Sequence, residues 1–147
     1  MSADRLKISL ANRLAEIAPL ADRVAAFCAE RRVSESVAFR INLALEELLT
    51  NTIKYGYADQ RAHEIVIELQ QSGDSVTVEI VDDGKPFDLT QAPTPDLDAP
   101  IEQRAIGGLG LHFVRTMMDE VRYCRDGSRN RVTLVKRTTP DGATPAP

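Results

Sequence analysis

The sequence predicts an α+β fold, in which helices and a sheet pack together as a two-layer sandwich. The hydrophobic period changes repeatedly along the chain, between the alternation typical of strands and the spacing typical of helices. Two pairs of alternating segments are joined by short turns, which indicates antiparallel hairpins. The chain has 147 residues, of which 43% are hydrophobic, so it can bury one core without a disulfide or a metal.

The chain begins with a predicted strand and a first helix. Residues 6–10 alternate between apolar and polar side chains, which predicts a short strand. From Pro19 the apolar residues recur at helical spacing, and this helix is expected to end near Arg31 and Arg32. Its apolar stripe consists of Leu20, Val24, Phe27 and Cys28.

A longer second helix is predicted from Ser34 to about Tyr55. Ser34 is suited to cap its N-terminus, because the hydroxyl can accept a hydrogen bond from a free backbone N–H. Gly56 is expected to end the helix. The core stripe of this helix consists of Val37, Ile41, Ala44, Leu45, Leu48 and Thr52.

The middle of the chain is predicted to form a hairpin and then a long loop. Residues 64–82 alternate on both sides of the turn "SGD", which predicts two antiparallel strands. The loop 83–107 carries four prolines. A loop of this length in a small domain is either a functional lid, which we place at about 85–107, or a disordered segment.

The last part of the chain is predicted to form a third helix, a second hairpin and a tail. The helix runs from about Leu109 to Asp119, and the hairpin covers residues 121–137. Residues 138–147 are rich in Pro and Thr, and we expect them to be disordered. We therefore expect residues 1–137 to form a single domain.

The composition argues against several classes of function. With 18 Lys and Arg against 22 Asp and Glu, the net charge is −4 and the basic residues are scattered, which argues against a nucleic-acid partner. No apolar run has the length of a signal peptide or a membrane span, so we expect a cytoplasmic protein with no membrane partner. Cys28 and Cys124 are interpreted as reduced core thiols, and His63 and His112 are not spaced as a zinc site.

The second helix carries polar residues beside its apolar stripe. Glu47, Asn51 and Tyr55 are four apart, so their side chains share one face at the edge of the core. Polar groups in such a place need partners, and asparagine is unfavourable in the middle of a helix. The alternative interpretation is a half-buried Asn51 bonded to a neighbouring loop and a Glu47 in solvent.

A second candidate feature is the stretch "VDDG" at the end of the first hairpin. Strand alternation turns Asp82, rather than Asp83, toward the core. Gly84 follows and allows a flat group to approach the backbone closely. Asp82 could accept a hydrogen bond from the amino group of a heterocycle, or it could simply cap the backbone amides of a polar turn.

A third candidate feature is the glycine-rich entry to the third helix. Gly107, Gly108 and Gly110 stand between the long loop and that helix. Free N–H groups and the helix dipole at such a place suit a phosphate, although the glycines could equally serve the movement of a lid. The segment has neither the ending of a Walker A loop nor the context of a dinucleotide fingerprint.

Together these features resemble the N, G1 and G2 boxes of the GHKL ATP-binding superfamily. The three boxes are Glu47-x-x-x-Asn51, Asp82-x-Gly84 and Gly108-x-Gly110. Residues from about Leu6 to Lys136 resemble the small anti-sigma-factor serine kinases of the RsbW and SpoIIAB type. The resemblance implies a two-layer sandwich of the GHKL (Bergerat) type, with a mixed or antiparallel sheet covered on one face by helices.

The resemblance also implies roles for individual residues toward ATP and Mg²⁺. Asn51 would hold Mg²⁺, Asp82 would bind the adenine amino group, and Gly84 would let the purine lie against the backbone. Glu47 would be the general base, and Arg104 in the lid would stabilise charge on the γ-phosphate. The other cofactor-binding residues implied by the match are Tyr55, Gly107, Gly108, Leu109 and Gly110.

Some positions depart from the pattern of the superfamily. The second glycine expected after Gly84 is missing, because the chain reads Lys85-Pro86-Phe87-Asp88 there. Tyr55 stands where a histidine is often found. The sequence shows no phosphoacceptor histidine or dimerisation helices before the first strand, so a two-component sensor kinase is not expected.

The resemblance implies an ATP-dependent protein serine/threonine kinase that acts as an anti-sigma factor by partner switching. Its partners would be a sigma factor and an anti-anti-sigma factor with a STAS domain, whose serine it would phosphorylate, and it would form a homodimer. The alternative is a nucleotide-responsive binding module of the same fold that regulates partners without phosphotransfer. A stand-alone ATPase is a third interpretation, which steady ATP turnover without any partner would favour.

Overall fold

A computed structural model of the chain describes residues 4–91 and 108–138. The strands are β1 (Arg5–Ala11), β2 (Glu64–Ser72), β3 (Ser75–Asp82), β4 (Glu120–Asp126) and β5 (Arg129–Arg137). The helices are α1 (Ile17–Glu30), α2 (Glu35–Tyr55) and α3 (Gly108–Met117), with short 3-10 helices η2 (Leu14–Glu16) and η3 (Leu89–Gln91). The predicted lid residues 92–107, with Arg104 and Gly107, and most of the predicted tail lie outside the described residues.

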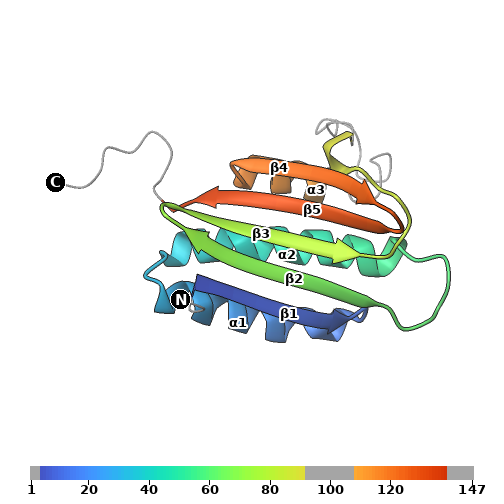
Figure 1. Cartoon of the computed structure of the whole chain (residues 1–147), viewed down its shortest axis with the longest axis horizontal. Coiled ribbons are helices and arrows are strands. Elements are labelled where there is room, and N and C mark those ends of the chain that lie inside the picture. The colour runs from blue at the N-terminus through green and yellow to red at the C-terminus, as the bar shows by residue number, and fades with distance from the viewer. Residues whose placement is uncertain (1–3, 92–107, 139–147) are drawn as a thin grey trace.

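The five strands form one antiparallel sheet in the order β1-β2-β3-β5-β4, as Figure 1 shows. Both predicted hairpins are present, and β5 pairs with β4 on one side and with β3 of the first hairpin on the other. In the register, Ile67 lies opposite Ile80, and Ile80 lies opposite Val132. Apolar residues from three strands therefore line up across one face.

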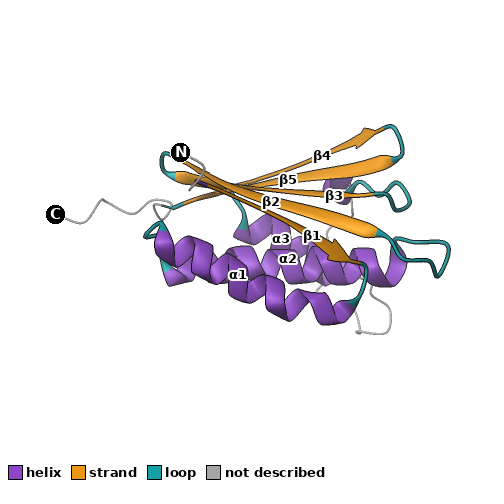
Figure 2. Ribbon diagram, turned by 60° about the horizontal axis from the view of Figure 1, so that its bottom comes forward, coloured by secondary structure: helices purple, strands orange, loops and turns teal. Residues whose placement is uncertain are grey.

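All three α-helices cover that same face of the sheet, and α2 lies between α1 and α3 (Figure 2). The core between the layers includes Ile65, Ile67 and Leu69 of β2, and Ile41, Leu45 and Leu49 of α2, each exposed by 1% or less. In the strands every second side chain points into this core, and in the helices the core side chains recur about every 3.6 residues. These two spacings explain why the hydrophobic period changes along the sequence. The predicted two-layer α+β sandwich is confirmed.

The structure shows the predicted start of α2 and a shift at the start of α1. The Ser34 hydroxyl accepts a hydrogen bond from Val37 N–H at 3.2 Å, so Ser34 is the cap. Helix α1 begins at Ile17, two residues before Pro19. A proline is tolerated there because the first N–H groups of a helix have no partner within the helix.

One sequence interpretation is wrong, because Cys124 is not a core thiol. Cys28 on α1 is fully buried, as expected, but Cys124 is exposed on β4. β4 is an edge strand, and of its residues only Val121 and Tyr123 pack against the core.

Among the described helices, none combines the length and the apolar character that a membrane span requires.

Candidate functional site

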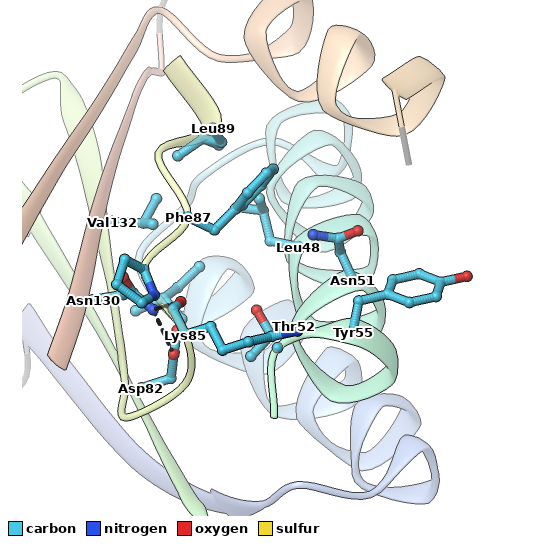
Figure 3. A pocket seen from close by; sticks show the side chains of 13 residues that line it. Leu48, Asn51, Thr52, Tyr55, Asp82, Lys85, Phe87, Leu89, Asn130 and Val132 are labelled. Carbon is cyan, nitrogen blue, oxygen red and sulfur yellow. Dashed lines mark hydrogen bonds between the residues drawn. The ribbon is translucent and has the colours of Figure 1, made fainter. Parts of the chain in front are cut away.

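A cavity of about 490 Å³ lies where the end of α2 faces the sheet. Figure 3 shows α2 on one side, with Asn51 and Thr52, and the sheet on the other, with Asp82 and Asn130. The segment after β3 borders it. The lining residues are Leu48, Asn51, Thr52, Tyr55, Gly56, Ile80, Asp82, Lys85, Pro86, Phe87, Leu89, Asn130 and Val132.

Asp82 is the buried carboxylate of this cavity. Asp82 is only 6% exposed, whereas Asp83 lies on the surface. The inward orientation of Asp82 that strand alternation predicts is therefore confirmed. Asp82 Oδ1 accepts hydrogen bonds from Gly84 N–H at 2.8 Å and from Asn130 Nδ2 at 3.0 Å. Oδ2 accepts none from any described residue. The carboxylate thus caps the turn and keeps one oxygen available to a ligand.

Asn130 is a site residue that the sequence analysis missed. It is 5% exposed and lies opposite Asp82 in the pairing of β3 with β5. Besides Asp82 it bonds Lys85 O through Nδ2 at 2.8 Å, and its Oδ1 accepts from Tyr123 Oη and Arg125 Nη1. A signal was present, because Asn130 continues the inward period of Val132 and Leu134 and is the polar member of that series.

The glycine at 84 is required by the backbone itself. A Cβ there would lie 2.7 Å from Gly56 O and 3.0 Å from Asp82 Oδ1. The next residue, Lys85, donates its backbone N–H to Gly56 O at 2.7 Å. The turn after β3 is therefore held against the end of α2, and only a residue without a side chain fits between them.

The three polar residues of α2 have different surroundings. Asn51 lines the cavity wall opposite the sheet, and Tyr55, 47% exposed, stands at the rim with its ring turned away from Asp82 (Figure 3). Glu47 is half-buried and does not line the cavity. Its carboxylate instead lies against Gly110 of α3, where a Cβ would overlap Glu47 Oε2. The helices α2 and α3 thus bring two of the predicted boxes together.

The remaining predicted site residues are either the first residues of α3 or precede that helix in the sequence. Gly108 and Leu109 form its first two residues, while Arg104 and Gly107 fall in the undescribed segment. Within the described ranges, no group of three His, Cys, Asp or Glu side chains could hold a metal. A magnesium ion at Asn51 would therefore depend chiefly on phosphate and water ligands, as is usual for this ion.

The residues present fit ATP. The cavity volume falls in the range of roughly 300–1,000 Å³ typical of small-molecule sites. Ile80, Val132 and Leu48 supply apolar walls for a flat base, and the free oxygen of Asp82 can accept from an amino group. Asn51 supplies an amide oxygen that can coordinate a magnesium ion.

A charged cluster ties the loop after α2 to the end of β3. His63 Nε2 lies 2.7 Å from Asp59 Oδ1, and Nδ1 lies 3.0 Å from Asp83 Oδ1. The hydrogen bond with Asp59, and then that with Asp83, raises the pKa of His63, and the bond with His63 lowers the pKa of Asp59. The imidazole stacks on Tyr57 at 4.2 Å, and burial, followed by the charges of Asp82 and Asp83, raises the pKa of Tyr57.

Comparison with known sequences gives a consistent result. Residues 10–136 match the family described as the histidine kinase-like ATPase domain. The serine/threonine-protein kinase BtrW of Bordetella bronchiseptica is 29% identical over 110 residues, which cover 75% of this chain and 78% of that protein. The anti-sigma F factor of a Thermoanaerobacter species is 31% identical over 116 residues, covering 78% of each chain. The serine-protein kinase RsbW of Listeria monocytogenes is 33% identical over 90 residues, covering 58% of this chain and 57% of that protein.

A solved structure shares the fold. It contains the RsbU and RsbW domains of Rv1364c from Mycobacterium tuberculosis, with a TM-score of 0.66 and 20% sequence identity. The match covers 90% of this chain and 32% of that one. At this identity the likeness concerns the fold, and it agrees with the two-layer arrangement described above.

Proposed function

Because this chain belongs to the histidine kinase-like ATPase domain family, we propose that it is an anti-sigma factor and protein-serine kinase. It binds MgATP and phosphorylates a serine of a small anti-anti-sigma protein with a STAS domain. Relatives named serine-protein kinase and anti-sigma F factor support this proposal. The observation that carries it is the buried Asp82, with one oxygen held by two donors and the other available at the cavity wall.

The residues of the cavity bind and orient the nucleotide. Asp82 Oδ2 accepts from the amino group of adenine, and Ile80 and Val132 pack against the base. Asn51 would hold Mg²⁺ through its amide oxygen, and the ion would supply charge stabilisation to the phosphates. The start of α3 at Gly108 presents free backbone N–H groups, which suit the phosphates.

Glu47 is the proposed general base for phosphotransfer. It accepts the proton of the partner's serine hydroxyl while the bond from that oxygen to the γ-phosphorus forms and the bond to ADP breaks. Its place against Gly110 puts the carboxylate beside the helix whose start receives the phosphates. Arg104 remains the proposed residue that stabilises charge on the γ-phosphate.

Partner switching requires only that phosphorylation of the serine changes the affinity of the kinase for one of its two partners. The protein, as a homodimer, holds either a sigma factor or the anti-anti-sigma protein. A phosphate on the serine adds a charge of about −1.5 to −2, and this lowers the affinity of the kinase for that one partner. The phosphorylated partner leaves, and the kinase can bind the sigma factor again.

The decisive experiment measures the mass of the co-purifying partner. The small protein that co-purifies from the native host is mixed with MgATP, and its intact mass is recorded before and after. We expect the gain of one phosphoryl group with the wild type and with Glu46→Ala, an exposed neighbour on the same helix, but no gain over the same time with Glu47→Ala.

An unchanged partner mass would contradict the kinase proposal. If ATP still bound and the complex still responded to nucleotide, the protein would be a binding module that regulates partners without phosphotransfer. The position of Glu47 outside the cavity lining favours testing this second function directly. Full transfer by Glu47→Ala would remove Glu47 from the mechanism.

A further inference from the structure

The hairpin β4–β5 holds the turn after β3 through the amide of Asn130. Its Oδ1 accepts hydrogen bonds from Tyr123 Oη at 2.6 Å and from Arg125 Nη1 at 3.1 Å. Its Nδ2 donates to Asp82 Oδ1 at 3.0 Å and to Lys85 O at 2.8 Å. Both ends of the amide therefore have partners, and the amide links the edge strand to the carboxylate of the cavity.

Arg125 decides which way this amide faces. A tyrosine hydroxyl can donate or accept, but a guanidinium can only donate, so the group next to Arg125 must be the oxygen of Asn130. Arg125 itself is anchored, because Nη1 also donates to Gly84 O at 2.8 Å. The NH₂ group of Asn130 must then point to Asp82, where it donates to Oδ1.

The orientation of Asn130 determines what Asp82 can offer. If the amide were turned over, its oxygen would face Asp82 Oδ1, and two acceptors would meet in a buried place. The carboxylate would rotate or shift to avoid this contact. With the amide oriented as observed, Oδ1 is occupied by two donors, and Oδ2 of this cavity-lining residue accepts no hydrogen bond from any described residue.

We propose that Asn130, oriented by Tyr123 and Arg125, is a positioning residue that aims Asp82 Oδ2 at the ligand and sets a preference for purines with an exocyclic amino group. The inference rests on the proposed nucleotide site. A purely structural network would affect all nucleotides alike. A positioning network would affect only a ligand that donates a hydrogen bond to Asp82.

The test compares ATP with purine riboside triphosphate, which carries hydrogen in place of the 6-amino group. Affinities for both are measured by calorimetry on the wild type, Tyr123→Phe, Arg125→Met and the double variant. A hydrogen bond to a charged group suggests a wild-type preference for ATP of about tenfold or more. We expect the double variant to lower that preference to about threefold or less, with its affinity for the analogue changed less than about twofold.

Arg122→Met is the matched control, because Arg122 is an exposed arginine on the same strand whose side chain forms one ion pair within the described residues, with Glu120 at 3.8 Å. It should keep the wild-type preference. Arg125→Met removes the donor that fixes the amide and keeps an unbranched side chain, so it decides the question if the double variant does not fold. We expect it to lower the preference at least about twofold.

Four results would overturn the inference. Equal weakening of both nucleotides would show that the network only supports the fold. An unchanged preference in folded Arg125→Met and in the double variant would show that Asn130 does not aim Asp82. A wild type that binds ATP and the analogue equally would leave the nucleotide site standing without this selectivity, whereas a wild type that binds neither would overturn the proposed function as well.

Discussion

The carboxylate of Glu47 on α2 lies directly against Gly110 on α3, so closely that a Cβ at residue 110 would overlap Glu47 Oε2 in its present position. The two residues are far apart in the sequence, and each belongs to a different predicted box. Their contact joins the proposed general base to the helix whose start suits phosphate. A glycine at 110 is thus needed to accommodate the glutamate.

Gly110→Ala should displace Glu47 without unfolding the protein. The atom that the new Cβ meets is the end of a flexible side chain, so we expect the free energy of unfolding to change by no more than about 1 kcal/mol. Phosphotransfer to the partner should fall about tenfold or more. The check is a double-mutant cycle, in which Glu47→Ala with Gly110→Ala is no slower than Glu47→Ala alone. Additive losses would show that the alanine acts elsewhere.

Asn51→Ala should weaken ATP binding only when magnesium is present. Loss of the amide oxygen removes a metal ligand, so titrations with Mg²⁺ should show a fall of about tenfold, and titrations with EDTA almost none. Asn42→Ala on the same helix is the control, since it loses only a bond to Ala21 O at 3.1 Å. That variant should keep the magnesium dependence. Equal losses with and without metal would mean that Asn51 does not serve the ion.

Gly84→Ala should damage both stability and nucleotide binding. Its Cβ meets the backbone oxygen of Gly56, which cannot swing aside, so the turn that carries Asp82 must move. We expect a loss of about 1–3 kcal/mol in the free energy of unfolding, together with weaker ATP binding. Gly73→Ala is the matched control: its φ of 58° causes strain, but it has open space around it. It should lose stability and bind ATP normally.

The His63 cluster should make stability depend on pH. Asp59 and Asp83 raise the pKa of His63 above its ordinary value of 6.5. The contribution of His63 to the free energy of unfolding is therefore complete below pH 6.5 and is lost as the pH rises through the raised pKa. The pKa of Asp59 is lowered below 3.8, so its contribution is present above 3.8 and is lost as the pH falls through the lowered value.

The measurement is the difference in Tm between the wild type and His63→Gln. We expect a larger difference at about pH 5.5 than at about pH 8.5. His112→Gln is the control for the loss of an imidazole, because the ring of His112 has no hydrogen bond or ion pair among the described residues, and its Tm difference at about pH 5.5 should be smaller than that of His63→Gln. A His63→Gln difference that grows toward high pH would contradict the assignment.

The two cysteines should differ in reactivity. Cys124 is exposed on an edge strand, whereas Cys28 is fully buried, and burial raises the pKa of its thiol despite the opposing charge of Arg31. Titration with a disulfide reagent should therefore detect one fast thiol in the native protein and two after denaturation. Cys124→Ser should remove the fast one. Rapid labelling of both thiols would contradict the burial of Cys28.

Much of the fold could be predicted because it is recorded in local patterns. The alternation in β2 and β3 and the helical spacing in α2 each follow from one face packing against the other layer. The same alternation distinguished Asp82 from Asp83, and the residue type identified Ser34 as a cap. Family motifs added the residues of the three boxes, whose roles toward ATP remain predictions.

Cys124 shows that a local pattern does not predict whether a strand lies in the centre or at the edge of a sheet. Its segment reads as an ordinary strand, but whether a strand is central or at an edge depends on which strands pair, and β5 rather than β4 joins β3. Burial of β4 is therefore set by topology. For the same reason, the local pattern around Cys124 does not predict that its thiol is exposed.

By itself the sequence determined the layers, the hairpins and the inward carboxylate, because each depends on residues within a few positions of one another. Only the tertiary structure decided that Asn130 meets Asp82, that Gly84 fits against Gly56 and that Glu47 rests on Gly110. Those pairs are brought together by strand order and helix packing. A local period carries no information about such contacts, since it states which face a side chain occupies and not what lies opposite it.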